Sequence, residues 1–379
     1  MSSSPAEADW LDETLPLPKA GLIWPWILAG SLLFVFGLYL LMPSFQEGPR
    51  VKPSPTLIAE QPQDPNTPMM VDEHALNFLV VDSATSSFAQ AAEELNRDMR
   101  RLTDGRVAFQ VHPAGQYKGQ KLDEMSIVQK VRKGEAQIAI VTCSPLANFA
   151  PAFEVLDLPF LFHSYEQADR VMQGPVGEKI LGTLGEYGLV GLGTLEVGFR
   201  IFSSSTPLPT LEDFRDKKVR VMQSSVAIGM ARALGCEAVP SPVDKIYQMG
   251  KEGYIDAADR TYPTYWDFKL YEVQRFITES RHSYTSKAII MNKAAYEKLS
   301  EADRKALRVA VKQVQLEQRK QQRLDDQRVK QECRKLGIQI YELEPAETAR
   351  FATACHPLYD EYLKLRGPEY IDAIRAAEK

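Results

Sequence analysis

Residue patterns that mark enzymes and metalloproteins are scarce in this chain of 379 residues. None of its four cysteines forms a C-x-x-C pair, none of its five histidines forms an H-x-x-x-H pair, and no G-x-S-x-G motif occurs. These spacings are typical of zinc sites, thioredoxin-like centres and hydrolases. We therefore expect no metal site, no cofactor and no catalytic residue, and we predict that the chain is not an enzyme.

The cysteines are few and widely separated. Their neighbours, such as Val141 and Leu234, are small or apolar, so ordinary burial as free thiols is the simplest interpretation. One or two disulfides are the alternative. The cysteines are Cys143, Cys236, Cys333 and Cys355.

An excess of positive charge is also lacking. The chain has 45 Lys and Arg residues against 50 Asp and Glu residues, for a net charge of −5. No stretch interleaves basic and aromatic residues as a groove for a nucleic-acid strand would require. Nucleic acid is therefore excluded as a leading partner.

One long hydrophobic run is present, because residues 20–46 carry no charge. As a helix, residues 22–42 would span about 32 Å, close to the hydrocarbon thickness of a bilayer. We predict a short N-terminal tail (1–19) followed by a transmembrane anchor (20–43). A cleaved signal peptide is the alternative, but the tail is acidic and the apolar run is long for one. The flanking charges weakly favour a cytoplasmic C-terminal part.

Beyond the anchor, residues 44–73 are rich in proline and have no hydrophobic period, which is typical of an extended linker. From residue 75 the chain alternates strands and helices. Leu76–Val81 is an apolar strand, apolar residues recur at helical spacing from 88 to 102, and a strand, a helix (122–132) and another strand (137–141) follow. This alternation predicts parallel strands with helices on the faces of the sheet.

A long helix is predicted between Ser300 and Gly337, a distance of roughly 54 Å. Its middle, residues 317–323, is entirely polar. Apolar residues on either side of this polar gap form two separate stripes, which we interpret as one helix that packs on two separate bodies. A coiled coil is the alternative, but it needs continuous heptads, and the polar gap interrupts them. The first apolar stripe consists of Leu307, Ala310, Val311 and Val314, and the second of Leu324, Cys333 and Leu336.

Three arginines lie in or next to apolar strands. Arg220 stands between Val219 and Val221, Arg200 ends the segment VGFR, and Arg260 follows IDAAD. An arginine keeps its charge when buried, so each needs an anionic partner. Each could pair with an internal carboxylate, but together they fit a site for an external carboxylate, which a guanidinium grips with two parallel hydrogen bonds.

Residues 75–365 resemble the solute-binding subunits of tripartite ATP-independent periplasmic (TRAP) transporters. The resemblance rests on ordered segments rather than on any one of them. These are HPAGQ (112–116), LDLPFLF (156–162), VGFR (197–200), KKVRV (217–221), ALGCEAVPSPVDKIY (233–247), GYIDAADR (253–260) and LYEVQRFITESRH (270–282).

The resemblance implies an α/β, two-lobed periplasmic-binding-protein-like fold with a long helix that spans both lobes, here preceded by one transmembrane helix. It places lobe I at 74–197 and 286–320, and lobe II at 198–285 and 321–379. It implies that Arg220 pairs with the substrate carboxylate and that Arg200 is a second contact. We add Thr142 and Tyr262 as candidate substrate-binding residues, although Tyr262 could equally belong to the core.

The chain departs from the family pattern at one informative place. Where the family usually reads Asp-Gly-x-Glu-Asn-Pro, this chain reads Asp256-Ala257-Ala258-Asp259-Arg260-Thr261. The position at which the family usually has an asparagine that contacts the ligand is thus occupied here by a third arginine, Arg260. Arg260 either supports a ligand with a second carboxylate or pairs with Asp259 or Asp256 and leaves the site. The membrane anchor is a further departure from the family.

These features predict a membrane-tethered solute-binding protein that captures a small organic acid, a carboxylate or dicarboxylate, and delivers it to integral membrane TRAP subunits. The resemblance places the globular part in the periplasm, anchored in the inner membrane, and overrides the weak charge signal. A tethered sensor that reports the carboxylate to a signalling partner is the rival function. An enzyme of the same lobed fold is a third class, disfavoured because no catalytic group can be named.

Overall fold

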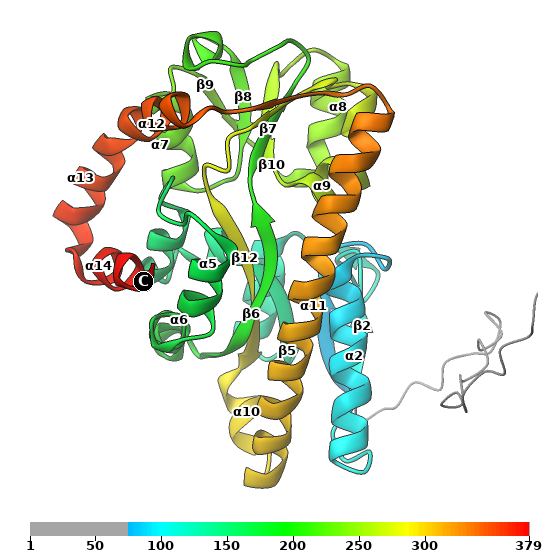
Figure 1. Cartoon of the computed structure of the whole chain (residues 1–379). Coiled ribbons are helices and arrows are strands. Elements are labelled where there is room, and N and C mark those ends of the chain that lie inside the picture. The colour runs from blue at the N-terminus through cyan, green and yellow to red at the C-terminus, as the bar shows by residue number, and fades with distance from the viewer. Residues whose placement is uncertain (1–74, 379) are drawn as a thin grey trace, which may run out of the picture. The chain divides into compact units, whose positions relative to one another are not determined.

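The computed structural model describes residues 75–378 (Figure 1). The predicted tail, anchor and linker lie outside the described residues. None of the helices within residues 75–378 is long and apolar enough to cross a membrane.

The first lobe is built around a five-stranded sheet with the order β2-β1-β5-β12-β6. Strands β1, β2 and β5 are parallel, as the alternation of strands and helices predicts, and β12 runs antiparallel to its neighbours β5 and β6. The strands are β1 Leu76–Val80, β2 Phe109–His112, β5 Ile138–Thr142, β6 Leu189–Phe199 and β12 Tyr284–Asn292, with a small hairpin of β3 Gln116–Tyr117 and β4 Gln120–Lys121.

Helices cover both faces of this sheet. Side chains alternate between the two faces, so Phe78 and Val80 belong to one hydrophobic core and Leu79 to the other. Ser86 caps α2 by accepting a hydrogen bond from the Ala89 N–H (3.1 Å). The helices of the lobe are α2 Ser87–Leu102, α3 Glu124–Arg132, α4 Cys143–Leu146, η1 Pro151–Asp157, α5 Tyr165–Met172, α6 Pro175–Gly182, η2 Thr183–Tyr187 and α10 Lys293–Lys298.

The second lobe is built around a six-stranded sheet with the order β13-β11-β7-β10-β8-β9. Its strands are β7 Ile201–Ser204, β8 Lys218–Val221, β9 Glu237–Pro240, β10 Ala257–Arg260, β11 Phe276–Glu279 and β13 Gln339–Glu342. Its short helices are η3 Leu211–Phe214, α7 Ser225–Ala233, η4 Val243–Lys245, α8 Ile246–Lys251, α9 Tyr262–Asp267 and η5 Leu270–Glu272. Hydrophobic cores again lie on both faces.

Two strand connections join the sheets. Arg200 alone separates β6 in the first sheet from β7 in the second, and residues 280–283 separate β11 from β12. The two connections touch, because the Arg200 N–H donates to the Ser283 carbonyl oxygen (2.8 Å). Arg200 therefore lies at the junction of the two lobes.

Helix α11, Glu301–Lys335, confirms the predicted long helix and runs along both lobes (Figure 1). Its first apolar stripe packs in the core of the first lobe. The second stripe differs from the prediction: Cys333 is buried, but Leu324 and Leu336 are 51% and 43% exposed, and Val329, four residues before Cys333, takes the buried position. Residues four positions apart, such as Val329 and Cys333, lie on the same face of a helix. Leu324 and Leu336 do not have this spacing from Cys333.

One face of the polar middle of α11 is buried, since Gln318, Arg319 and Gln322 are buried there. Gln318 exchanges two hydrogen bonds with the backbone of Glu196 in β6, both 2.9 Å long. Arg323 pairs with the Glu196 carboxylate (2.8 Å) and with Asp169 of α5 (2.7 Å). The polar residues between the two apolar stripes therefore contact β6, the strand that leads into the second lobe.

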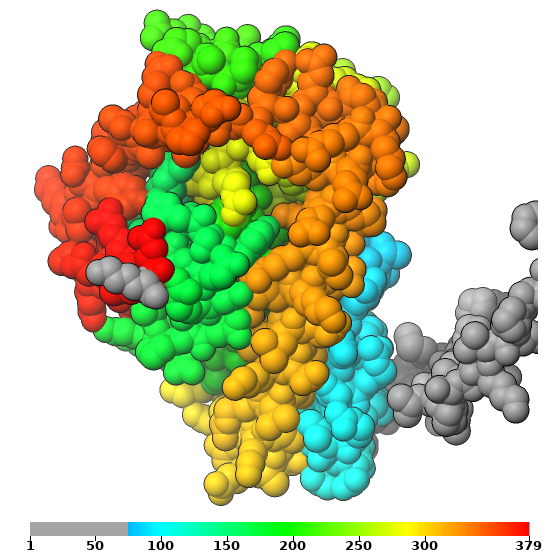
Figure 2. Space-filling model, in the orientation of Figure 1, coloured from blue at the N-terminus to red at the C-terminus, as the bar shows by residue number. Residues whose placement is uncertain are grey.

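The C-terminal segment returns from the second lobe to the first through α12 Pro345–Ala354, α13 His356–Arg366 and α14 Glu369–Ala376 (Figure 2). Phe351 of α12 packs in the second lobe, whereas Ile371 and Ile374 of α14 pack in the first. The sequence-based boundary placed all of residues 321–379 in lobe II. The apolar side chains of α14 find their partners on α6 and η1 instead.

All four cysteines are free and buried, as the residues around them suggested.

Candidate functional site: a buried arginine cluster between the lobes

Three arginines gather where strands of the second sheet end at the junction of the lobes. Ala258 of β10 lies opposite Arg220 of β8 in a parallel pair, so Arg260, two residues further on, points to the same face as Arg220. The charge of Arg200 contributes to lowering the pKa of Arg220, and the charge of Arg220 contributes to lowering the pKa of Arg260. The structure thus brings together the three arginines that the sequence singled out.

Arg200 has a carboxylate partner within the chain. Its Nε donates to Asp259 Oδ1 (2.5 Å), one terminal nitrogen donates to the Asp259 carbonyl oxygen (2.7 Å), and the other donates to the Thr285 hydroxyl (3.3 Å). This pairing is the internal ion pair that the sequence left open for each arginine. Only the N–H groups of Arg200 that this pairing does not use can donate to a ligand.

Asp259 also accepts a hydrogen bond from His282 Nε2 (3.1 Å). Burial alone would raise the pKa of Asp259, but the Arg200 guanidinium and the His282 hydrogen bond hold it well below its usual value. Burial lowers the pKa of His282, so the imidazole is neutral at neutral pH and donates from Nε2. Its Nδ1 lies 2.6 Å from the Ser280 hydroxyl. The resulting Arg200–Asp259–His282 group carries no net charge.

Arg220 differs because all its hydrogen bonds go to backbone carbonyl oxygens. Its Nε and one terminal nitrogen donate to Ser241 (2.9 and 2.5 Å), and the other terminal nitrogen donates to Asp259 (3.4 Å). The residue is 4% exposed, and no carboxylate lies within 4.0 Å of it among residues 75–378. Burial lowers its pKa to about 9. Carbonyl oxygens thus fix the guanidinium but leave its charge uncompensated.

Arg260 is even less satisfied. It is 1% exposed, its Nε donates weakly to the Ala258 carbonyl oxygen (3.3 Å), and both terminal nitrogens lack a partner within the described part of the chain. The two carboxylates named as internal partners are engaged elsewhere: Asp259 binds Arg200, and Asp256 accepts the Lys218 N–H (2.8 Å). Burial lowers the pKa of Arg260 well below its usual value. A buried, unpaired guanidinium is costly unless an anion joins it.

Tyr262 begins α9 and is buried, next to the strand that carries Arg260. Its hydroxyl makes no hydrogen bond of good geometry within residues 75–378, and burial together with the nearby Glu279 carboxylate raises its pKa. Tyr265, in contrast, donates to the Gln274 carbonyl oxygen (2.6 Å) and belongs to the core. Of these two tyrosines, only Tyr262 keeps a hydroxyl available to another molecule.

Thr142 lies at the end of β5, in the first lobe. Its N–H and hydroxyl both donate to Glu124 Oε1 (2.9 and 2.6 Å). The buried Lys287 lies 3.5 Å from the same carboxylate and 2.6 Å from Asp82. The pKa of Arg220 is lowered chiefly by burial, and the charge of Glu124 partly opposes this lowering, so this wall of the first lobe lies near the arginine cluster.

Sequence reasoning named Asp259 only as a possible partner of Arg260, and it missed His282 and Lys287. Asp259 carried the same signal that singled out Arg220, because it is a charged residue within an apolar strand. His282 and Lys287 carried weaker signals, since each becomes informative only when the register of β12 and the position of Asp259 are known.

Comparisons with known proteins agree with this architecture. The model of the family described as bacterial extracellular solute-binding protein, family 7, matches residues 79–365. A solute-binding protein of Chromohalobacter salexigens is 30% identical over 276 residues, 73% of this chain and 80% of that protein. A C4-dicarboxylate-binding periplasmic protein of Rhodobacter capsulatus is 28% identical over 317 residues, 82% of this chain and 93% of that protein.

Among solved structures, a TRAP periplasmic solute-binding protein of Chromohalobacter salexigens with bound D-glucuronate is similar, with a TM-score of 0.75 and 28% identity. The match covers 80% of this chain and 99% of that chain. A sugar-acid-binding protein of Advenella mimigardefordensis in complex with galactonate has the same TM-score at 27% identity, covering 80% of this chain and 97% of that chain. The chain therefore belongs to family 7 of the bacterial extracellular solute-binding proteins, the solute-binding proteins of TRAP transporters.

Proposed function

We propose that this chain captures a small organic acid between its two lobes and delivers it to integral membrane TRAP subunits. The observation that carries the proposal is the pair of buried guanidinium groups, Arg220 and Arg260, that have no carboxylate partner among residues 75–378. A ligand carboxylate supplies the missing anion. Closure of the lobes around it excludes water and strengthens its hydrogen bonds.

The charge of the site favours a ligand with two carboxylates. Arg200 is compensated by Asp259, which leaves one positive charge on Arg220 and one on Arg260. Arg220 has hydrogen-bonded three of its guanidinium nitrogens to carbonyl oxygens, so the two remaining N–H groups can grip one carboxylate. Arg260 and the Tyr262 hydroxyl then receive the second. Arg200 lines the site with its unused N–H groups, whereas Thr142 lines it with both of its donors already bound to Glu124.

Relatives with a named ligand support a carboxylate as the solute, although only one of those named above has a ligand with two carboxylates. Those named above bind a C4-dicarboxylate, D-glucuronate or galactonate. The replacement of the usual family asparagine by Arg260 adds a cation and moves the preference of this chain towards dianions. A dianion binds such a site more tightly than a monoanion because each buried guanidinium gains its own partner.

Residues 20–43 anchor the protein in the inner membrane in this account, and the proline-rich linker (44–73) holds the lobes on the periplasmic side. Tethering keeps the binding protein close to its membrane subunits, because holding two partners together raises their effective local concentration. The proposal predicts that the full-length protein sediments with membranes. Recovery of the intact chain in the soluble periplasmic fraction would contradict the tether but not the binding function.

Thermal-shift screening of the full-length protein against a panel of monocarboxylates and dicarboxylates tests the binding function. A ligand present at about 100 times its Kd stabilises the folded state by about 2.7 kcal/mol, which raises the melting temperature by a few degrees. We expect at least one dicarboxylate to do so and matched neutral diols to have no effect. A panel in which no acid shifts the melting temperature would contradict the proposal.

A further inference from the structure

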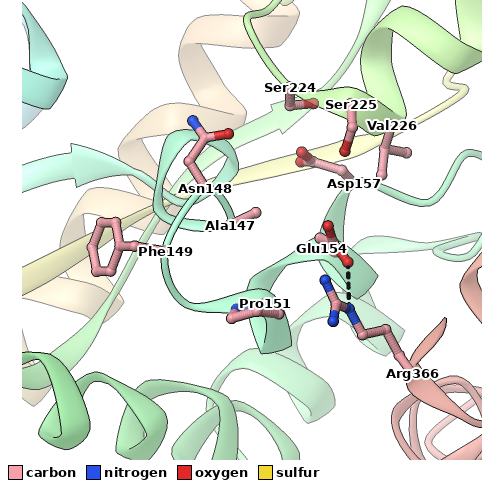
Figure 3. A pocket seen from close by; sticks show the side chains of 10 residues that line it. All are labelled: Ala147, Asn148, Phe149, Pro151, Glu154, Asp157, Ser224, Ser225, Val226 and Arg366. Carbon is pink, nitrogen blue, oxygen red and sulfur yellow. Dashed lines mark hydrogen bonds and ion pairs between the residues drawn. The ribbon is translucent and has the colours of Figure 1, made fainter.

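A cavity of about 280 Å³ lies where the lobes meet, lined by both lobes and by the C-terminal segment (Figure 3). Residues 147–157 of the first lobe form one side, the start of α7 in the second lobe forms another, and Arg366 at the end of α13 completes it. Its polar lining consists of Asn148, Glu154, Asp157, Ser224, Ser225 and Arg366.

Asp157 is the one lining charge that is left uncompensated. It is 7% exposed, its Oδ1 accepts from the Ser144 hydroxyl (2.5 Å), and its Oδ2 accepts no hydrogen bond of good geometry within the described residues, although the nearby Ser224 hydroxyl opposes the rise in pKa that burial causes. The other two charged residues of the lining neutralise each other, because Arg366 Nε donates to Glu154 Oε2 (2.8 Å). A buried carboxylate oxygen without a partner costs free energy that a hydrogen-bond donor would recover.

The cavity adjoins the arginine cluster: Ser224 of its lining lies four residues after Arg220, and the N–H of Phe160, three residues after Asp157, donates to the His282 carbonyl oxygen (2.7 Å). Burial raises the pKa of Asp157 to about 6, and among the groups that modify it are the guanidinium of Arg200, which lowers it, and the carboxylate of Asp259, which raises it. Charges affect a buried carboxyl in this way only at short range. A small ligand held by Arg220 and Arg260 can therefore extend a third group towards Asp157.

Building on the carboxylate-binding function proposed above, we propose that Asp157 is a subsite for an ammonium group of the same ligand, so that the solute is an acidic amino acid. The arginine cluster has two uncompensated positive charges and the cavity has one uncompensated negative charge. Two carboxylates and one ammonium complement this pattern. The Ser225 hydroxyl and the Asn148 amide oxygen supply the further acceptors that an ammonium, with three donors, can use.

A metal ion is a poorer occupant of the cavity. Within residues 75–378 no group of three or more His, Cys, Asp or Glu side chains could hold one. A ligand hydroxyl would satisfy Asp157 Oδ2 as well, but an ionised donor forms a hydrogen bond roughly twice as strong as a neutral one. The amino and hydroxy acids of equal length therefore separate these alternatives.

The subsite should weaken in acid. Asp157 is faced by Cys143 and Ser144 of α4, Ser224 at the start of α7, Arg200, Asp259, and the Glu154–Arg366 pair. Burial raises the pKa of Asp157 to about 6, and Cys143 stays a neutral thiol because burial raises its pKa to about 12. An ammonium binds the carboxylate, so its contribution is present above pH 6 and fades as the pH falls below it.

Isothermal titration calorimetry on the full-length protein tests the proposal with two matched series: succinate, L-malate and L-aspartate, and glutarate, L-2-hydroxyglutarate and L-glutamate. In at least one series at pH 7.5, we expect the amino acid to bind about tenfold more tightly than the plain diacid and more tightly than the hydroxy acid. This preference should shrink at pH 5.5.

The variant Asp157→Asn should lose the preference for the amino acid while its affinity for the plain diacid stays within about threefold of wild type. Asp104→Asn, a change at an exposed turn of the first lobe, should keep the preference. An amino acid that binds no better than the plain or the hydroxy diacid, or a preference that survives Asp157→Asn, would overturn the subsite and leave the proposed function standing. Absence of binding by every acid would overturn both.

Discussion

Arg220 donates two hydrogen bonds to a single acceptor, the carbonyl oxygen of Ser241, through its Nε (2.9 Å) and a terminal nitrogen (2.5 Å). This arrangement fixes the plane of the guanidinium in a buried position without supplying a negative charge. A neighbouring carboxylate would have fixed the side chain equally well but would have neutralised it. In the function proposed above, the carboxylate of the ligand supplies this charge.

The Arg200–Asp259 ion pair should contribute strongly to the stability of the fold. Replacing Asp259 by Asn leaves Arg200 buried without a counter-charge, and breaking a buried pair in this way costs about 3–5 kcal/mol. Urea denaturation of the full-length protein measures this loss. Asp104→Asn, which changes an exposed carboxylate, serves as the control and should change stability by less than about 0.5 kcal/mol. Equal stability of the Asp259→Asn variant and wild type would disprove a structural role for the pair.

The same pair predicts a pH dependence. The pKa of Asp259 lies below its unfolded value, so the carboxylate stabilises the fold at pH values above about 4, and this contribution is lost as the pH falls below that value. The free energy of unfolding of wild type should therefore decrease in acid more steeply than that of Asp259→Asn. Parallel pH profiles for the two proteins would be inconsistent with a lowered pKa.

Asp326 of α11 should act in the opposite direction. Burial raises its pKa to about 7, and its Oδ1 has no partner within the described residues, although Oδ2 accepts from the Tyr165 hydroxyl (2.9 Å). A raised pKa means that the native state binds the proton more tightly, so this group costs stability as the pH rises from about 4 through 7. Asp326→Asn should melt at a higher temperature than wild type at pH 8 and at a similar temperature at pH 4.5. A lower melting temperature at pH 8 would count against this assignment.

Two substitutions in α11 test which residues attach it to the second lobe. Val329 is fully buried, so Val329→Ala should cost about 1–3 kcal/mol, whereas Leu324→Ala at a half-exposed position should cost less than about 0.5 kcal/mol. Chemical denaturation gives both values. The reverse order would favour the apolar stripe that the sequence predicted.

Arg260 should determine the preference for dianions. Arg260→Asn introduces the residue that the family usually carries, removes a buried charge and should weaken binding of a dicarboxylate by at least tenfold relative to a monocarboxylate of equal length. Because the variant also removes an unpaired guanidinium, the ligand-free protein should become more stable. Calorimetry for binding and thermal melting for stability check the two effects separately. Unchanged affinity for the dicarboxylate would remove Arg260 from the site.

The sequence predicted those features that depend on local periodicity. The parallel strands of the first lobe and the helix Glu301–Lys335 follow from apolar spacing and from the Ser300 cap, which are visible within a few residues. The arginines were also visible, because a charge within an apolar strand is a local anomaly.

Features that depend on register could not be predicted. Asp259 meets Arg200 across 59 residues because β7 and β10 pair in one particular register. The buried polar contact between Gln318 and Glu196 likewise joins residues 122 positions apart, so the polar middle of α11 looks like an exposed surface in the sequence. Asp157 becomes notable only because three distant segments enclose it.

The most direct test of the account compares wild type with Arg220→Gln and with Arg101→Gln, a control at an exposed surface ion pair, in calorimetric titrations with the dicarboxylate that gives the largest thermal shift. The account predicts that Arg220→Gln folds but binds at least 100-fold more weakly, while the control binds as wild type does. Binding of a carboxylate by Arg220→Gln with wild-type affinity would contradict it.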